Sequence, residues 1–227
     1  MPEDAPVLSR SVEDYLKAIY SLSEGGAAAS TSDIATMLDV QPASVSGMVK
    51  RLAESGLADH APYRGVRLSP EGNREALRII RRHRILETYL NQRLGYSWDD
   101  VHAEAERLEH AASEELIDRM ASALHHPRHD PHGAPIPTRT GDVEIIDHPT
   151  LAQVASGDKV AIRAVQDEDS ERLRYMEARG LLPGVVLSIE SRAPFNGPIA
   201  VRVGGTDGEL QTVGYDLATK IRVAVEG

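Results

Sequence analysis

The sequence predicts a mainly α-helical chain that ends in a small all-β module. Apolar residues recur at helical spacing through most of the first 124 residues. From about residue 151, short runs of alternating apolar residues are separated by glycine-containing turns. A segment rich in proline and histidine, residues 125–140, separates the two parts. We therefore expect helical N-terminal domains followed by a small barrel of about five strands.

The N-terminal part is predicted to begin with three helices. Ser11 is a suitable N-cap for the first helix, because acidic residues follow it in the first turn. Residues 31–33, Thr-Ser-Asp, are expected to cap a short helix over residues 34–38. Pro42 then stands where the first turn of a third helix should be, and Gly56 is suited to the position after its end.

A hairpin is expected next, because two short strand-like runs flank Tyr63-Arg64-Gly65. A helix-turn-helix followed by a hairpin is the pattern of a winged helix, in which the second helix of the pair enters the major groove. The alternative is a helical domain that does not bind DNA. DNA binding is favoured by the basic residues around these elements, Lys50, Arg51, Arg64 and Arg67.

The stretch from His83 to His110 has the most unusual chemistry. His83 and Glu87 are four residues apart in a helix expected from Pro70 to about residue 93. A second helix, from about residue 97, would place four further residues within an arc of about 100°. These residues are His102, Glu106, Glu109 and His110.

This face requires water, cationic partners or a metal, because burying unpaired charges is costly. Imidazole and carboxylate ligands without thiolate suit Mn²⁺, Fe²⁺, Co²⁺ or Zn²⁺. A solvated charged face is the simpler alternative. A ferritin-like di-metal bundle does not fit, because no histidine has a glutamate three residues before it.

The helical part is expected to end with residues 111–124, either continuous with the preceding helix or after a break. Its apolar stripe would form either core or the seam of a two-fold dimer: Leu116, Ile117, Met120 and Leu124. The next segment contains four histidines without helical spacing, His125, His126, His129 and His132. Five prolines or glycines among them predict an extended, turn-rich segment and not a metal site.

The C-terminal module is predicted from four strand-like runs and one short helix. The helix covers residues 170–178 and ends at Gly180. The strand-like runs are residues 159–165, 185–190, 199–203 and 221–225.

Composition sets limits on the class of protein. Of 227 residues, 41% are hydrophobic and 26% charged, as in an ordinary globular protein. The chain has no cysteine, so it has neither disulfides nor thiolate ligands. The acidic N-terminus is not a signal peptide, and no apolar run of 18 residues could span a membrane, so we expect a cytoplasmic protein. A net charge of −10 argues against indiscriminate polyanion binding but does not exclude a basic DNA-binding face.

The sequence resembles the diphtheria-toxin-repressor family of metal-dependent regulators, especially its manganese-responsive branch. The resemblance covers nearly the whole chain, and the order and spacing of its motifs carry it. The motifs are residues 13–16 (EDYL), 42–46 (PASVS), 63–66 (YRGV), 82–87 with His83 and Glu87, 101–110 with His102, Glu106, Glu109 and His110, 130–137 (DPHGAPIP) and 181–184 (LLPG).

The resemblance implies four regions: a winged helix-turn-helix domain (residues 1–73), a helical metal-binding and dimerisation domain (74–140), a linker (141–150) and an SH3-like, FeoA-like domain (151–227). It also implies two metal sites per protomer. One site would use Asp14, Glu106, Glu109 and His110. The other would use His83, Glu87, His102 and an acid of the SH3-like domain, for which Asp169 is the candidate and Glu171 the alternative.

The implied function is that of a transcriptional repressor and not of an enzyme. A divalent metal, Mn²⁺ or alternatively Fe²⁺, would act as corepressor, with Co²⁺ or Zn²⁺ able to bind in vitro. A homodimer would bind a palindromic operator controlling metal-homeostasis genes. The other interpretations are a di-metal hydrolase and a regulator whose His/Glu face is structural. The expected DNA contacts are Gln41, Ala43, Ser44, Ser46, Lys50, Arg51 and Arg64.

Overall fold

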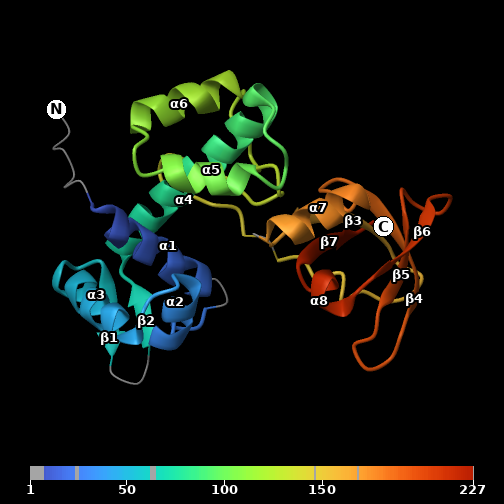
Figure 1. Ribbon diagram of the computed structural model, residues 1–227, viewed down its shortest axis with the longest axis horizontal. Coiled ribbons are helices and arrows are strands. Elements are labelled where there is room, and N and C mark those ends of the chain that lie inside the picture. Colours follow the sequence, from blue (N-terminus) through green and yellow to red (C-terminus); the bar gives the residue numbers. More distant parts are fainter. Residues whose placement is uncertain (1–7, 24–25, 62–64, 146, 168, 227) are drawn as a thin grey trace. The chain divides into compact units, whose positions relative to one another are not determined.

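The computed structural model describes residues 8–23, 26–61, 65–145, 147–167 and 169–226 (Figure 1). The chain forms two compact units. The first contains Met1–His83, Glu109–Ala112 and Pro137–Asp142, and the second contains Arg84–Leu108, Ser113–Ile136 and Val143–Gly227. Among the helices in the described ranges, none is long and apolar enough to cross a lipid bilayer.

The first unit is the predicted winged helix. Its elements are α1 (Arg10–Ser23), α2 (Thr31–Met37), α3 (Pro42–Glu54), β1 (Ala58–Ala61), β2 (Gly65–Leu68) and the first turns of α4 (Pro70–Leu94) (Figure 1). The three N-terminal helices bury one apolar face each in a shared core. The fully buried residues of this core include Leu16, Ile19, Ile34, Val45 and Val49. Because α1 and α3 share this core, the position of one constrains the other.

The helix ends follow local chemistry. Pro42 is the first residue of α3, and Gly56 follows its end with a positive φ of 73°, both as predicted. The expected cap of α2 at residues 31–33 is wrong by one position. Ser30 is the N-cap, because its hydroxyl accepts the Asp33 backbone N–H at 3.0 Å.

The hairpin pairs β1 with β2 in antiparallel register, from Ala58 opposite Leu68 to Ala61 opposite Gly65. Residue 29 adds a further bridge to Val66. The backbone passes so closely here that a Cβ on Gly65 would lie 2.8 Å from the Ala29 carbonyl oxygen. The expected turn and DNA contact at Arg64 lie outside the described residues.

The helical part of the second unit contains the rest of α4, α5 (Val101–Leu108) and α6 (Glu114–Ala123). A single helix carrying His102 through His110 was expected, and this is wrong. Ser113 adopts extended backbone and its hydroxyl caps α6 by accepting the Leu116 N–H at 3.2 Å. α5 therefore ends at Leu108, and Glu109 and His110 lie in the turn that follows.

The rest of the second unit is a five-stranded antiparallel sheet with the order β6-β5-β4-β3-β7. Its elements are β3 (Lys159–Val165), α7 (Ser170–Ala178), β4 (Val186–Arg192), β5 (Ile199–Val203), β6 (Glu209–Val213), α8 (Tyr215–Ala218) and β7 (Ile221–Val225) (Figure 1). The prediction of a small barrel-like module of about five strands is confirmed. Its core includes fully buried Leu151, Ile162, Leu173 and Met176.

One residue of this core comes from the helical part of the unit. Trp98, between α4 and α5, is 6% exposed and packs in the core of the module. Its indole N–H donates to the Pro131 carbonyl at 2.9 Å. The following turn pairs with β3, because the Val165 N–H donates to the His132 carbonyl at 2.8 Å. The helical part and the β module of this unit therefore share one packed interior.

Gly133 makes this close approach possible. Its φ is +86°, and a Cβ there would lie 2.1 Å from the Arg163 carbonyl oxygen. Gly157 has a similar φ of +92° but open space around it.

We predict that Gly133→Ala destabilises this unit by about 2 kcal/mol more than Gly157→Ala, because overpacking adds to the backbone strain of about 1 kcal/mol. Urea unfolding followed by the fluorescence of Trp98, the only tryptophan, measures both. Equal losses of stability in the two variants would show that the turn at Gly133 shifts to accept the added Cβ without a cost in free energy.

Candidate metal centre

Three side chains of the first unit form a group suited to a divalent cation. Asp14 comes from α1, and Glu109 and His110 come from the turn after α5. Each offers one ligand atom, and these atoms lie within 4.8 Å of one another. The sequence predicted all three as ligands of one site, and the structure brings them together across more than 90 residues of chain.

His110 is the centre of this group. Its Nδ1 lies 2.6 Å from Glu13 Oε2, so Nδ1 carries the hydrogen, because a carboxylate only accepts. When the imidazole is neutral, its lone pair is therefore on Nε2, which lies 2.9 Å from Asp14 Oδ1 and 3.5 Å from Glu109 Oε1. This Nε2 is buried and makes no hydrogen bond within the described part of the chain. A buried lone pair directed at two carboxylates fits a cation bound between them.

Glu13 is a site residue that the sequence did not single out. It is only 8% exposed, and Arg82 Nη1 donates to its Oε1 at 3.1 Å. A carboxylate on the far nitrogen fixes the orientation of a metal-binding imidazole. The only signal in the sequence was the acidic pair Glu13-Asp14. Neighbouring residues of a helix point about 100° apart, so if Asp14 binds the ion directly, Glu13 has a different role.

Glu109 carries more contacts than the sequence suggested. Its side chain is fully buried. The Lys17 ammonium donates to both of its oxygens, at 3.1 and 3.2 Å, and His83 Nδ1 lies 2.5 Å from Oε2. Lys17 belongs to α1, one turn after Asp14, and its ion pair with Glu109 was not predicted.

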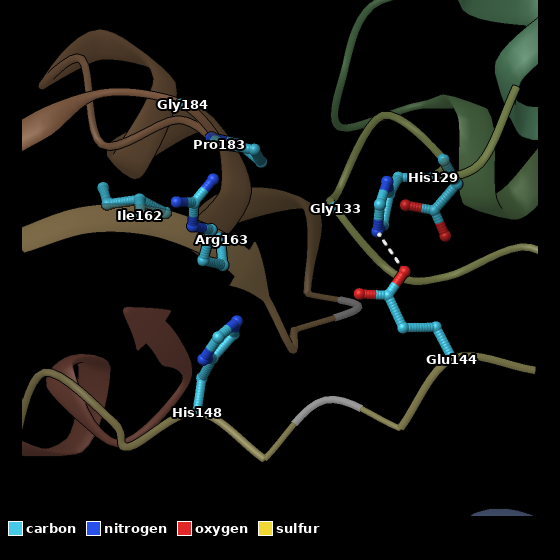
Figure 2. Close-up of a pocket in the computed structure, with 9 residues that line it drawn as sticks. His129, Gly133, Glu144, His148, Ile162, Arg163, Pro183 and Gly184 are labelled. Atoms are coloured by element: carbon cyan, nitrogen blue, oxygen red, sulfur yellow. Dashed lines mark ion pairs between the residues drawn. The ribbon is translucent and has the colours of Figure 1, made fainter. Parts of the chain in front are cut away.

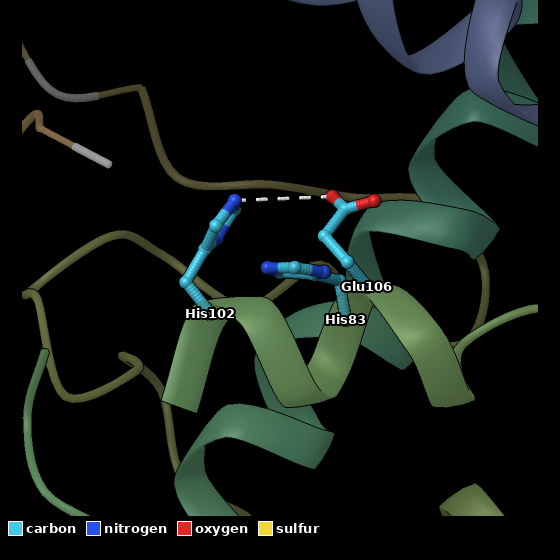
Figure 3. Close-up of side chains that lie close together, drawn as sticks. All are labelled: His83, His102 and Glu106. Carbon is cyan, nitrogen blue, oxygen red and sulfur yellow. Dashed lines mark ion pairs between the residues drawn. The ribbon is translucent and has the colours of Figure 1, made fainter. Parts of the chain in front are cut away.

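The second unit contains Glu87 and His102, two of the residues predicted for the other site, and also Glu106. His102 Nδ1 lies 3.2 Å from Glu87 Oε1, and its Nε2 lies 4.0 Å from Glu106 Oε1. Figure 3 shows His102 and Glu106 on neighbouring turns of α5, drawn together with His83 of α4. Glu106 was predicted with Asp14 and Glu109, whereas here its ion pair is with His102. His83 stands one helical turn before Glu87 on α4.

A third group, which the sequence did not predict, is buried and includes Glu87. Ligand atoms of Glu87, Asp130 and His132 lie within 4.8 Å of one another. The Trp98 carbonyl lies 2.9 Å from His132 Nε2, and Asp130 accepts the His132 and Ala134 backbone N–H groups. Burial and the charge of Glu87 raise the pKa of Asp130 to about 6. The turn-rich segment is therefore more than a connection, because it supplies buried polar groups next to a predicted ligand.

Asp169 has a local role that its sequence position did not reveal. Its side chain caps α7 by accepting the Arg172 N–H at 2.9 Å, and this bond lowers the pKa of the carboxyl. In the described residues it belongs to none of the three groups. Glu171 does not join them either. A metal contact from the SH3-like module therefore stays a prediction.

A pocket of about 350 Å³ in the second unit borders the third group, because Asp130 also lines it (Figure 2). His129 and Glu144 form an ion pair of 3.4 Å at its edge, and Arg163 and His148 also line it. Its acidic and basic groups are mixed and partly exposed, so the pocket has no clear preference for one ligand charge.

The predicted DNA-binding residues lie on α3 and directly before it. Val45, Met48, Val49 and Leu52 face the core. The opposite face is exposed and carries Gln41, Ala43, Ser44, Ser46, Lys50 and Arg51. This is the face that a recognition helix presents to DNA.

Family models cover three parts of the chain. Residues 7–66 match the iron-dependent repressor N-terminal DNA-binding domain, and residues 69–138 match the iron-dependent repressor metal-binding and dimerisation domain. Residues 150–225 match the FeoA domain.

Known proteins match over nearly the whole chain or over about half of it. The iron-dependent repressor IdeR of Mycobacterium tuberculosis is 30% identical over 93% of this chain and 95% of that protein. The regulator MntR of Geobacillus kaustophilus is 36% identical over 53% of this chain and 84% of that protein. A solved manganese-dependent transcriptional repressor in complex with manganese is 37% identical, covers 95% of this chain and 100% of that chain, and superposes with a TM-score of 0.87.

The hydrolase interpretation is therefore set aside, because these relatives are DNA-binding regulators. The chain belongs to the iron-dependent repressor family of metal-dependent, DNA-binding transcriptional repressors.

Proposed function

We propose that this repressor responds to Mn²⁺, which acts as its corepressor, with two ions bound per protomer. The observation that carries this proposal is the buried His110 Nε2, which makes no hydrogen bond among the described residues and lies beside two carboxylates. In support, a solved relative is a manganese-dependent repressor in complex with manganese.

The first site would be held by Asp14, Glu109 and His110, with Glu106 as the fourth predicted ligand. The second would be held by His83, Glu87 and His102, with Asp169 as the predicted contribution of the SH3-like module. All of these ligands are carboxylate oxygens or imidazole nitrogens, and the chain has no cysteine. Such hard donors suit Mn²⁺, whereas sulfur ligands favour softer ions.

The first site links metal binding to the winged helix through α1. Without a cation, Asp14, Glu13 and Glu109 bring three carboxylates to one imidazole, and the ion pairs with Arg82 and Lys17 offset only part of this negative charge. A divalent ion supplies two positive charges at this point. Asp14 is then held to the turn, and α1 transmits its position to α3 through their shared core.

The proposed readout is the spacing of two α3 helices in a homodimer. A palindromic operator requires its half-sites to be one helical turn, or a multiple of it, apart. Metal binding would favour the dimer geometry that fits this spacing. On each α3, the proposed phosphate contacts are Ser44, Ser46, Lys50, Arg51 and, from the hairpin, Arg64, while Gln41 and Ala43 face base edges.

The second candidate is an iron-responsive repressor of metal-homeostasis genes. It is favoured by the full-length similarity to iron-dependent repressors. The oxygen-rich ligand set favours the manganese proposal, because sulfur ligands would suit the softer ion better.

We predict that Mn²⁺ raises the DNA affinity of the repressor at least ~10-fold, a coupling free energy of about 1.4 kcal/mol. The DNA should be a site selected from a random pool by the Mn²⁺-loaded protein, and fluorescence anisotropy with Mn²⁺ or with chelator measures the difference. His110→Ala should abolish the difference while leaving the chelator value unchanged. Equal affinities for the wild type in both conditions would rule out a corepressor role.

A second prediction concerns Glu13. Glu13→Gln removes the carboxylate that orients His110, so Mn²⁺ binding should weaken by roughly 10-fold or more. Isothermal titration calorimetry measures the affinity. Glu54→Gln is the matched control, because Glu54 forms only an exposed pair with Lys50 at 3.8 Å and its loss should change the affinity by less than about 2-fold. Indistinguishable affinities for the two variants would contradict the orienting role.

The third prediction concerns the choice of metal. Mn²⁺ should activate DNA binding fully at free concentrations where Fe²⁺ activates less. Replacing two oxygen ligands by sulfur, in Asp14→Met with Glu106→Cys, should shift the response toward Fe²⁺ or Co²⁺. Anaerobic DNA-binding titrations against buffered free metal test both statements. A wild type that responds to lower Fe²⁺ than Mn²⁺ would support the iron-responsive candidate instead.

A further inference from the structure

Lys17 brings a positive charge into the group that is suited to a cation. Its ammonium lies 3.1 and 3.2 Å from the two carboxylate oxygens of Glu109. The Glu109 side chain is fully buried, and that of Lys17 is 20% exposed. This ion pair is therefore shielded from solvent far more than a surface pair, and its charges act on each other strongly.

The same carboxylate also faces the metal-binding group. Glu109 Oε1, which accepts from Lys17, lies 3.5 Å from the buried His110 Nε2 and belongs to the cluster with Asp14. A divalent ion bound there would share Glu109 with the ammonium. Two cations held by one buried carboxylate repel each other, so each weakens the binding of the other.

We propose that Lys17 is a built-in competitor that lowers the affinity of this group for its metal. It neutralises Glu109 when the group is empty, and it opposes both the first divalent ion and any second ion bridged by Glu109. The residue thereby sets the free metal concentration at which the repressor responds. This inference rests on the proposed metal binding by Asp14, Glu109 and His110.

The competing explanation is that Lys17 only holds Glu109 in place. The two explanations predict opposite signs. If Lys17 were a positioning residue, removing its charge would leave a buried carboxylate misplaced and would weaken metal binding. If Lys17 is a competitor, removing its charge strengthens metal binding.

The test measures Mn²⁺ binding to the full-length metal-free protein from the electron paramagnetic resonance signal of free Mn²⁺. The class of sites lost in His110→Ala is assigned to this group. Lys17→Gln and Lys17→Met should bind this class at least ~10-fold more tightly than the wild type, because they lack the ammonium. Lys17→Arg, which keeps the charge, should stay within about 3-fold of the wild type.

Lys159→Gln is the matched control for loss of one positive charge. Lys159 belongs to the β module and forms a half-exposed pair with Glu226 at 3.9 Å, so its substitution should leave the affinity unchanged. Unchanged or weaker binding in both neutral Lys17 variants would overturn the competitor role. If instead His110→Ala removed no class of sites, the proposed metal site itself would fail, which is a distinguishable result.

A kinetic measurement keeps the test decisive if the neutral variants do not fold without metal. Protein folded with Mn²⁺ is mixed with excess chelator, and release of the ion is followed by stopped flow. Release from the class assigned to His110 should be at least ~5-fold slower in Lys17→Gln and Lys17→Met than in the wild type. Equal or faster release would overturn the proposal.

Discussion

The imidazole of His110, held between carboxylates on both of its nitrogens, is the constraint on which the proposed site depends. Glu13 fixes one nitrogen, and Asp14 and Glu109 face the other. This arrangement joins α1, which forms the core of the winged helix, to a turn that follows in sequence almost 90 residues later. The same contact therefore supplies the proposed metal ligands and connects metal binding to the position of α3.

Much of the fold was visible in the sequence, because short-range chemistry fixes it. Pro42 starts α3, Gly56 follows its end, and α7 stops before Gly180, each through a preference that acts within one turn. The ligand types were also predictable, since imidazoles and carboxylates in one stretch have few other uses. Features that depend on residues close together in the sequence, such as helix ends and ligand types, could thus be predicted without a structure.

What the sequence could not reveal depends on contacts between distant segments. A helical face from His102 to His110 was expected, but α5 ends at Leu108 and a turn separates it from α6, which divides the residues between two groups. The sequence did not indicate an ion pair between Lys17 and Glu109, and it placed His132 in a proline-rich connection. Only tertiary packing shows that one contacts buried Glu109 and the other lies beside Glu87.

The position of Trp98 has a consequence for how such chains can change length. The only tryptophan lies in the loop between α4 and α5, yet its ring fills the interior of the β module. Deleting the module would expose this ring and leave the 130–133 turn without its partner strand. A shorter regulator built on the same helices would have to replace Trp98 as well as omit the module. The C-terminal module is therefore an integral part of this chain's hydrophobic interior. We expect the module and Trp98 to be inherited or lost together.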